Sequence, residues 1–243
     1  MNGMIGFENV CAGYGKIKVL DNLSFDAKQG EIFGVIGPNG SGKTTMLAAL
    51  AGQIRLSSGR IIFDGGDISG LKPHCRCRMG IGRTFQVPRP FAGMTVFENV
   101  LAAAVHGAGL NRKEAAEAAE DCLETVGLAD KSNAAAGELT LLDSKKLEAA
   151  RALGTRPRLL LLDETAAGLT EAETEEIIEL ALKLKKRGLT IIWIEHILEV
   201  MRYATDMLMC MAEGRNVICG TPEEVMGSDI VEEIYLGSRE QST

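Results

Sequence analysis

The sequence lacks several features that would assign it to other classes of protein. Its 243 residues contain no apolar run long enough for a membrane-spanning helix, and the N-terminus does not follow the pattern of a signal peptide. Basic residues number 26 against 33 acidic ones, and the net charge of −7 argues against a nucleic-acid partner, which needs a basic face. We therefore expect a soluble protein that can still dock on a membrane protein.

Cysteine pairs suited to zinc or disulfides are also missing. The six cysteines are scattered, and the close pair in His74-Cys75-Arg-Cys77 has no second pair elsewhere to complete a zinc site. Free thiols in a reducing compartment are the expectation. The sequence is 46% hydrophobic and has neither internal repeats nor low-complexity segments, so it fits one large domain or a core with appended subdomains.

The most informative stretch is Gly37-Pro-Asn-Gly-Ser-Gly-Lys-Thr44, which fits the P-loop pattern G-x-x-x-x-G-K-[ST]. An apolar strand is predicted over 31–36 and a helix over 45–51, ending at Gly52, which is the context this motif needs. Glycines let the backbone approach phosphates closely, and the N–H groups that open the helix form an anion site. The motif predicts that Lys43 reaches the β- and γ-phosphates and that Thr44 holds Mg²⁺, so the chain binds a nucleoside triphosphate.

Two regions outside the P-loop differ in composition. Before Gly30 and again over 59–66, apolar and polar residues alternate in short runs separated by turn residues, which predicts antiparallel strands. From about 96 to 153, Ala, Glu and Leu dominate, and the segment 112–126 is helical by propensity. We interpret this second region as an α-helical insertion.

The segment 159–163, an apolar run that ends in an acid, and the segment 190–194 predict buried strands of a parallel sheet. The segment 171–187 between them predicts an amphipathic helix, with glutamates at its start, basic residues at its end and Gly188 after it. Its apolar face comprises Ile177, Leu180, Ala181 and Leu184. Strands that alternate with helices predict a parallel sheet with helices on both faces.

Five further side chains are candidates for chemistry. Asp163 ends an apolar strand, where a carboxylate can hold the Mg²⁺ shell, and Glu164 can direct or deprotonate an attacking water; a solvated acid is the alternative for Glu164. Gln86 is either a contact to the metal or the water, or a surface amide. His196 is either a hydrogen-bond donor to a γ-phosphate or a structural histidine. Tyr14 either stacks on a base or anchors its glycine-flanked turn.

The P-loop, Gln86, Asp163-Glu164 and His196 occur in the order and approximate spacing of ATP-binding-cassette (ABC) ATPases. The chain resembles this superfamily over its whole length, and within it the ATPase subunits of branched-chain amino acid importers. The segments that carry the narrower resemblance are Gly82-Arg-Thr-Phe-Gln86, Met94-Thr-Val-Phe-Glu-Asn-Val100, Ala166-Ala-Gly-Leu169, Ile194-Glu-His196, Gly220-Thr-Pro-Glu-Glu-Val225 and Tyr235-Leu-Gly237.

The resemblance implies an α/β fold: a P-loop (RecA-like) ABC ATPase core with a parallel sheet, an N-terminal antiparallel β subdomain and an α-helical subdomain. It implies one ABC domain over 1–243, with the β subdomain at about 1–30 and 59–66 and the helical subdomain at about 88–155. The remainder is expected to form the nucleotide-binding core.

The resemblance also implies roles for named residues, with ATP and Mg²⁺ as cofactors. Glu164 is the expected catalytic base, His196 the contact to the γ-phosphate, and Gln86 and Lys43 complete the catalytic set. Tyr14 is expected to stack on adenine. The nucleotide-binding set is Tyr14, Gly37, Pro38, Asn39, Gly40, Ser41, Gly42, Lys43, Thr44 and Thr45, and the metal-binding set is Thr44, Gln86 and Asp163.

The chain departs from the family at the signature motif, normally close to Leu-Ser-Gly-Gly-Gln, which acts on the partner's ATP. The aligned residues are Leu139, Thr140, Leu141, Leu142 and Asp143. Thr140 and Asp143 predict a capping box that keeps the positive end of the following helix. Two leucines in place of the glycines bring side chains that hinder close approach of the backbone.

The resemblance implies an ATP-hydrolysing motor subunit of an importer for branched-chain or related amino acids. It implies a second ABC ATPase subunit as partner, with a heterodimer favoured over a homodimer, transmembrane permease subunits, and indirectly a substrate-binding protein. The expected location is cytoplasmic, peripheral on the inner face of the plasma membrane. The alternatives are a regulatory subunit with weak hydrolysis and a soluble ABC ATPase outside transport. A GTPase is disfavoured because no Asn-Lys-x-Asp motif occurs.

Overall fold

The computed structural model describes residues 3–240, so the ends of the predicted 1–243 domain, residues 1–2 and 241–243, lie outside the described residues. The chain divides into two compact units, each described by itself. The first unit is Met1–Pro73 with Thr190–Thr243, and the second unit is His74–Leu189.

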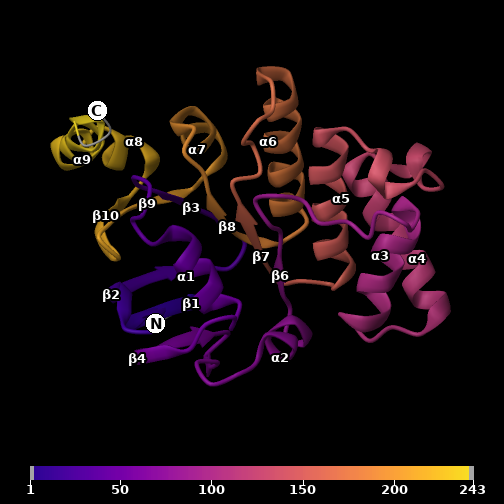
Figure 1. Cartoon of the computed structure of the whole chain (residues 1–243), viewed down its shortest axis with the longest axis horizontal. Helices are drawn as coiled ribbons and strands as arrows, with labels where there is room; N and C mark the ends of the chain where they lie inside the picture. The colour runs from indigo at the N-terminus through magenta and orange to yellow at the C-terminus, as the bar shows by residue number, and fades with distance from the viewer. Residues whose placement is uncertain (1–2, 241–243) are drawn as a thin grey trace. The chain divides into compact units, whose positions relative to one another are not determined.

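The first unit holds most of the strands (Figure 1). Its elements are β1 (Ile5–Tyr14), β2 (Ile17–Ala27), β3 (Ile32–Ile36), α1 (Lys43–Leu50), β4 (Leu56–Phe63), β5 (Gly66–Asp67), β8 (Thr190–Ile194), α7 (Leu198–Ala204), β9 (Met207–Ala212), β10 (Arg215–Gly220), α8 (Pro222–Met226) and α9 (Asp229–Glu240).

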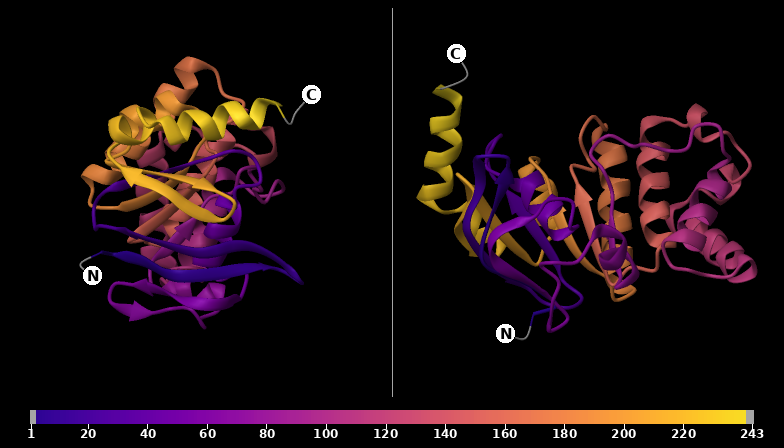
Figure 2. Two further views of the ribbon diagram at one scale, coloured as in Figure 1. Left: turned by 90° about the vertical axis from the view of Figure 1, so that its left-hand side faces the viewer. Right: turned by 60° about the horizontal axis from the view of Figure 1, so that its bottom comes forward.

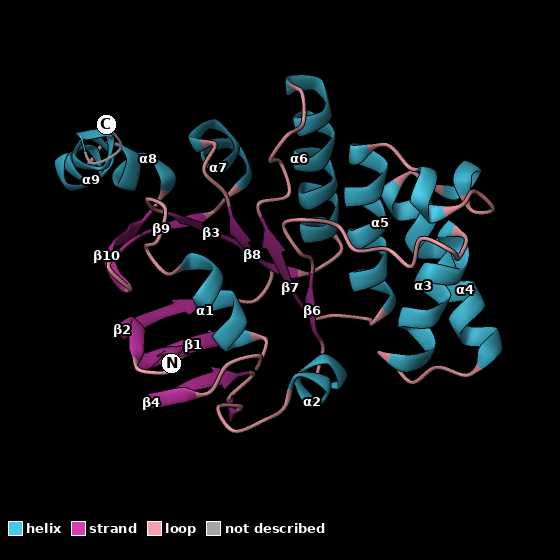
Figure 3. Cartoon of the chain, viewed as in Figure 1, coloured by secondary structure: helices cyan, strands magenta, loops and turns pink. Residues whose placement is uncertain are grey.

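The second unit is mainly helical in the part of the chain described (Figure 3). Its elements are α2 (Pro73–Arg78), β6 (Ile81–Arg83), α3 (Val96–His106), α4 (Arg112–Val126), the 3₁₀ turns Ala129–Lys131 and Ala136–Glu138, α5 (Leu141–Gly154), β7 (Leu159–Asp163) and α6 (Glu171–Lys186).

Strands of the first unit form two hydrogen-bonded arrays. One is antiparallel in the order β2-β1-β4-β5, as the alternating runs near the N-terminus predict. In the other, β3 lies between β8 and β9 and pairs in parallel with both. The predicted parallel sheet is mixed, however, because β10 pairs with β9 antiparallel. The short turn between β9 and β10 permits only this antiparallel return.

Three stacked aromatic rings join the two arrays of the first unit. The Phe7 and Phe25 ring centroids are 4.6 Å apart and the Phe25 and Phe33 centroids 5.1 Å apart. These rings come from β1, β2 and β3, and all three are buried. Each stacked pair of aromatic rings contributes about 0.5–1.5 kcal/mol in addition to the stabilisation from burying its apolar surface. The stacked rings hold β3, and so the loop that follows it, against the antiparallel strands.

In the second unit, α3, α4 and α5 pack around one apolar cluster that includes Val96, Val100, Leu123 and Leu147. Each of these helices begins at a residue whose side chain caps the first turn: Thr95 for α3, Asn111 for α4 and Thr140 for α5. Such caps contribute about 1 kcal/mol each. Beside this helical cluster, β6 and β7 pair in parallel.

Candidate functional site

The P-loop connects β3 to α1 in the first unit. All five residues of β3 are buried, so the loop leaves from a fixed strand. Gly37, Gly40 and Gly42 have φ values of 145°, 79° and 101°, a region that residues with a side chain rarely adopt. A Cβ on Gly37 would lie 2.1 Å from the carbonyl oxygen of Met211 in β9. The loop therefore requires glycine here for both conformation and space.

The start of α1 carries no side-chain cap within the described residues. Gly42 occupies the N-cap position in a left-handed conformation, and it has no side chain to bond the first N–H groups of the helix. These N–H groups and the positive end of the helix dipole have the chemistry that an anion requires. Ser41 Oγ is buried and has no hydrogen-bond partner among the described residues. Thr44 is exposed at the same helix start, whereas Thr45 is buried.

Lys43 is almost fully buried, and its ammonium lies over the loop itself. Nζ donates to the carbonyl oxygen of Gly37 at 2.7 Å and to that of Pro38 at 3.0 Å. A buried ammonium is costly unless it is hydrogen-bonded. The two carbonyls satisfy this need while keeping the positive charge beside the glycine-rich turn.

Tyr14 and His196 also belong to the first unit. Tyr14 ends β1 in the turn to β2, and its side chain is 54% exposed, which disfavours the alternative of a buried anchor for that turn. His196 follows β8 and is exposed. The residue before it, Glu195, follows directly after β8, is fully buried and accepts a hydrogen bond from Trp193 Nε1 at 3.3 Å.

Asp163 ends β7 in the second unit, as predicted for a carboxylate after a buried strand. Oδ2 pairs with a guanidinium nitrogen of Arg83 at 3.0 Å. Oδ1 is buried and accepts no hydrogen bond from any described residue. A buried carboxylate oxygen without a hydrogen-bond partner is costly, and a bound cation is one partner that would satisfy it.

Glu164 lies directly after Asp163 and is only 8% exposed. Its φ of 50° is left-handed, which is uncommon for a residue with a side chain and marks a constrained position. The carboxylate accepts a short hydrogen bond from Nε2 of Gln86. The structure therefore brings Gln86 and Glu164 together, and it disfavours a solvated acid at position 164.

Sequence reasoning missed Lys145 of α5. This side chain is buried, and its Nζ donates to the backbone carbonyl oxygen of Glu164 at 3.2 Å. No motif identifies it, because its role depends on α5 packing beside the turn after β7. In the sequence Lys145 stands between Ser144 and Lys146, so no local signal marks it as a buried lysine.

The signature residues open α5. The Thr140 hydroxyl accepts a hydrogen bond from the backbone N–H of Asp143 at 3.2 Å. The Asp143 carboxylate in turn accepts hydrogen bonds from the same hydroxyl at 2.9 Å and from Lys131 Nζ at 2.6 Å. The predicted capping box is therefore only half formed, because the carboxylate turns to the hydroxyl and Lys131. Burial alone would raise the pKa of Asp143, but the bonds from Lys131 and Thr140 outweigh it and hold the pKa below its usual value. Leu141 is 47% exposed at the helix start.

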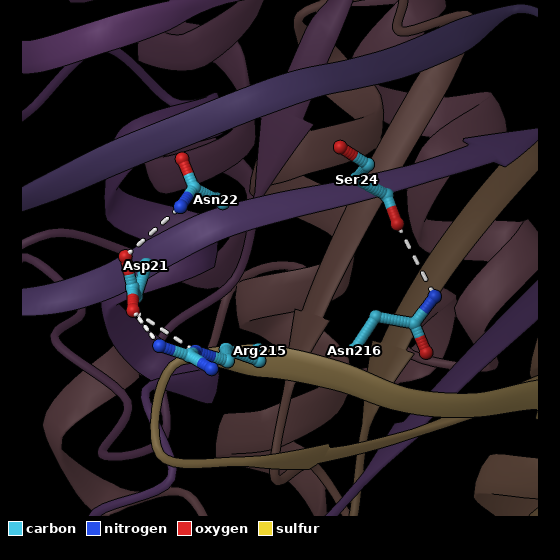
Figure 4. A pocket seen from close by; sticks show the side chains of 5 residues that line it. All are labelled: Asp21, Asn22, Ser24, Arg215 and Asn216. Carbon is cyan, nitrogen blue, oxygen red and sulfur yellow. Dashed lines mark hydrogen bonds and ion pairs between the residues drawn. The ribbon is translucent and has the colours of Figure 1, made fainter.

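A separate polar pocket of about 310 Å³ lies between β2 and β10 in the first unit (Figure 4). Arg215 Nε donates to Asp21 at 2.9 Å, and Asn216 Nδ2 donates to the Ser24 carbonyl oxygen at 3.2 Å. These bonds tie the two strands together. None of the predicted site residues lines this pocket.

Comparison with known proteins decides the family. A family model described as ABC transporter matches residues 20–167, more than half of the chain. The chain belongs to the ABC transporter family. This ABC protein is 34% identical to the probable branched-chain amino acid transport ATP-binding protein LivG of Archaeoglobus fulgidus, over 96% of this chain and 95% of that one. It is also 32% identical to the lipopolysaccharide export system ATP-binding protein LptB of Haemophilus influenzae, over 96% of both chains.

Solved structures agree with this assignment. The ADP conformation of an ATP-binding cassette of an ABC transporter matches with a TM-score of 0.87 at 32% identity, covering 96% of this chain and 98% of that chain. This ABC protein is thus an ATP-binding transporter subunit and an ATPase, and the predictions of family, α/β fold and enzyme class are confirmed. Within residues 3–240, no helix has the length and apolar character needed to cross a membrane.

Proposed function

We propose that this ABC ATPase drives an importer of branched-chain or related amino acids. The likeness to amino acid transport ATP-binding proteins over nearly the whole chain supports the substrate class. The single observation that supports a working motor is the buried Glu164, constrained after β7 with its carboxylate on Gln86. A subunit that had lost hydrolysis would be under no physical need to keep a carboxylate in this costly position.

Nucleotide binding is assigned to the first unit. The exposed ring of Tyr14 would stack on adenine. The loop from Gly37 to Thr45, which includes Pro38, Asn39, Gly40, Ser41, Gly42 and Thr44, would surround the phosphates, with its N–H groups as donors. Lys43 would stabilise the β- and γ-phosphates. The uncapped start of α1 and the buried Ser41 Oγ without a partner in the described chain fit an anionic ligand.

Magnesium binding is assigned to Thr44, Gln86 and Asp163. They offer hydroxyl, amide and carboxylate oxygens, the hard donors that this ion prefers. The buried Oδ1 of Asp163, which no described group hydrogen-bonds, fits a cation ligand. When bound, Mg²⁺ would neutralise charge on the phosphate oxygens during phosphoryl transfer.

Hydrolysis would proceed by attack of water on the γ-phosphorus of ATP. The Glu164 carboxylate would accept a proton from the water as its oxygen bonds to phosphorus, and the bond from phosphorus to the β-γ bridging oxygen would break to leave ADP and inorganic phosphate. Lys43 and the loop N–H groups would stabilise the charge that develops, and His196 would donate a hydrogen bond to the γ-phosphate. The hydrogen bond from Gln86 orients the base.

We further propose that the partner ATPase is a different chain. The exposed side chain of Leu141 occupies the helix start that would face the partner's γ-phosphate, and it opposes close approach of the backbone to that phosphate. A homodimer would contain two such impaired signatures, whereas a heterodimer would contain one. Such a pair would work at the inner face of the plasma membrane, bound to its permease subunits and fed by a substrate-binding protein.

Reconstitution tests this function. The chain, its partner ATPase and its permeases are placed in proteoliposomes, and uptake of radiolabelled leucine is measured with ATP inside and the binding protein outside. We expect ATP-dependent uptake that Lys43→Ala abolishes. ATP turnover without uptake of any branched-chain amino acid, stimulated instead by lipopolysaccharide, would overturn the substrate class and favour the export role of the LptB relative.

The second candidate, a regulatory subunit with weak hydrolysis, is favoured by the signature residues alone. Single-turnover hydrolysis of ATP by the purified chain, with and without its partner ATPase, separates the two candidates. A motor accelerates hydrolysis when paired. A regulatory subunit leaves all turnover to the partner, so that Glu164→Gln in this chain would not lower the rate of the pair.

A further inference from the structure

The C-terminal helix α9 contributes a side chain to the P-loop. The hydroxyl of Tyr235 accepts a hydrogen bond from the backbone N–H of Gly37 at 3.0 Å, although the two residues are 198 positions apart. Both lie in the first unit, where α9 follows α8, and α8 contacts β9 and β10 (Figure 2). Burial raises the pKa of Tyr235 to about 12, so the hydroxyl is neutral at physiological pH.

Gly37 is the residue on which the loop turns away from β3, and it is held from three directions. Its N–H donates to Tyr235, and its carbonyl oxygen accepts from Lys43 Nζ at 2.7 Å. The carbonyl oxygen of Met211 closes the side where a Cβ would stand. Because Gly37 is buried, its N–H needs a protein partner, and the loss of that partner would leave a costly unpaired donor.

Gly37 links Tyr235 to Lys43. Its N–H donates to the Tyr235 hydroxyl, and its carbonyl oxygen accepts a hydrogen bond from the Lys43 ammonium. We propose that Tyr235 is a positioning residue of the nucleotide site, which fixes Gly37 and thereby Lys43, so that docking of α9 and binding of the ATP phosphates favour each other. This rests on the proposed function of the P-loop as the phosphate site. The coupling is reciprocal, as any linkage between two binding equilibria must be.

Tyr235→Phe tests the coupling in the full-length chain, because it removes the hydroxyl and keeps the ring. The probe is a fluorescent ATP analogue carrying a methylanthraniloyl group, titrated with Mg²⁺ present. We expect the Kd to rise about tenfold, the size of one net hydrogen bond. Tyr203→Phe is the matched control, because that tyrosine on α7 is 73% exposed, and its Kd should equal that of the wild type.

Hydrogen exchange supplies a readout that a purely structural role would not change. In the wild type, ATP should slow exchange of the α9 amides, and in Tyr235→Phe this protection should disappear. Equal ATP-dependent protection in both proteins, or a wild-type Kd in Tyr235→Phe, would overturn the inference. If Tyr235→Phe does not fold, the wild type alone decides, because absence of ATP-dependent protection in α9 refutes the coupling and its presence supports it.

The same titration keeps this inference separate from the proposed function. If Lys43→Ala binds the analogue as tightly as the wild type, the P-loop is not the phosphate site and the proposed function fails. If Lys43→Ala loses binding while Tyr235→Phe retains the wild-type Kd, the phosphate site stands and only the role of Tyr235 is rejected.

Discussion

Substitution of Gly37 by alanine perturbs the P-loop by one methyl group at its most constrained position. The new Cβ would lie 2.1 Å from the Met211 carbonyl oxygen and 2.9 Å from Ser41 Oγ. Ordinary contacts between such atoms begin at about 3.5 Å, so backbone must move by about 1 Å or more. The φ of 145° adds strain for any residue with a side chain.

The expected cost follows from these two effects. Overpacking against a fixed backbone costs about 1–3 kcal/mol, and a conformation that disfavours side chains costs about 1–3 kcal/mol. Together they lower the free energy of unfolding by about 2–6 kcal/mol, a large part of the roughly 5–15 kcal/mol typical of a folded protein. If the loop moves instead to relieve the clash, part of this cost appears as weaker nucleotide binding.

Urea unfolding and titration with the fluorescent ATP analogue measure the two outcomes. Gly30→Ala is the matched control, because Gly30 has a φ of 77° and no described atom lies within 4 Å of its built Cβ. That variant should lose only about 1–2 kcal/mol of stability and keep its affinity for nucleotide. If Gly37→Ala matches Gly30→Ala in both measurements, the Met211 carbonyl does not fix the loop.

Two further predictions concern the second unit. Lys145→Met should lower kcat for ATP at least fivefold while KM stays unchanged, because the backbone carbonyl of Glu164 loses a charge-assisted hydrogen bond. Lys145→Arg should restore part of the rate. An unchanged kcat of Lys145→Met in steady-state assays would refute this role. The pKa of Asp143 is lower in the folded than in the unfolded protein, where it is about 3.9. The ion pair with Lys131 therefore contributes its full stabilisation at pH values above this unfolded pKa. The contribution is lost as the pH falls through the folded-state pKa of Asp143. Thermal melts from pH 7 to 3 should therefore show a shallower acid loss in Asp143→Asn than in the wild type, and parallel curves would contradict the assignment.

Local signals were strong enough to predict several elements to the residue. The helix over 112–126 and the strands over 159–163 and 190–194 have the predicted bounds, because an uninterrupted propensity or apolar run coincides with each element. The strand expected to begin at Gly59 begins earlier, at Leu56, since pairing with β1 carries it through the left-handed glycine. Tertiary pairing there overrides the turn signal.

Contacts between distant segments were beyond the sequence. Nothing near Tyr235 indicates that its hydroxyl meets Gly37, and nothing near Lys145 indicates the carbonyl of Glu164, because each contact depends on how helices pack. The strand pair β9 and β10 was likewise not predicted. The identity of the candidate site residues, in contrast, follows from short motifs, since the P-loop and the acidic strand end each need a fixed local spacing.

Glu164 is proposed to activate the water that cleaves ATP. Single-turnover conversion of radiolabelled ATP to ADP, in the complex with its partner ATPase and permeases, tests it directly when only this chain carries Glu164→Gln. We expect the rate at this chain's site to fall at least about a hundredfold, with ATP still bound, while Glu171→Gln at the exposed start of α6 keeps the wild-type rate. A Glu164→Gln complex that cleaves ATP in both sites as fast as the wild type would contradict it.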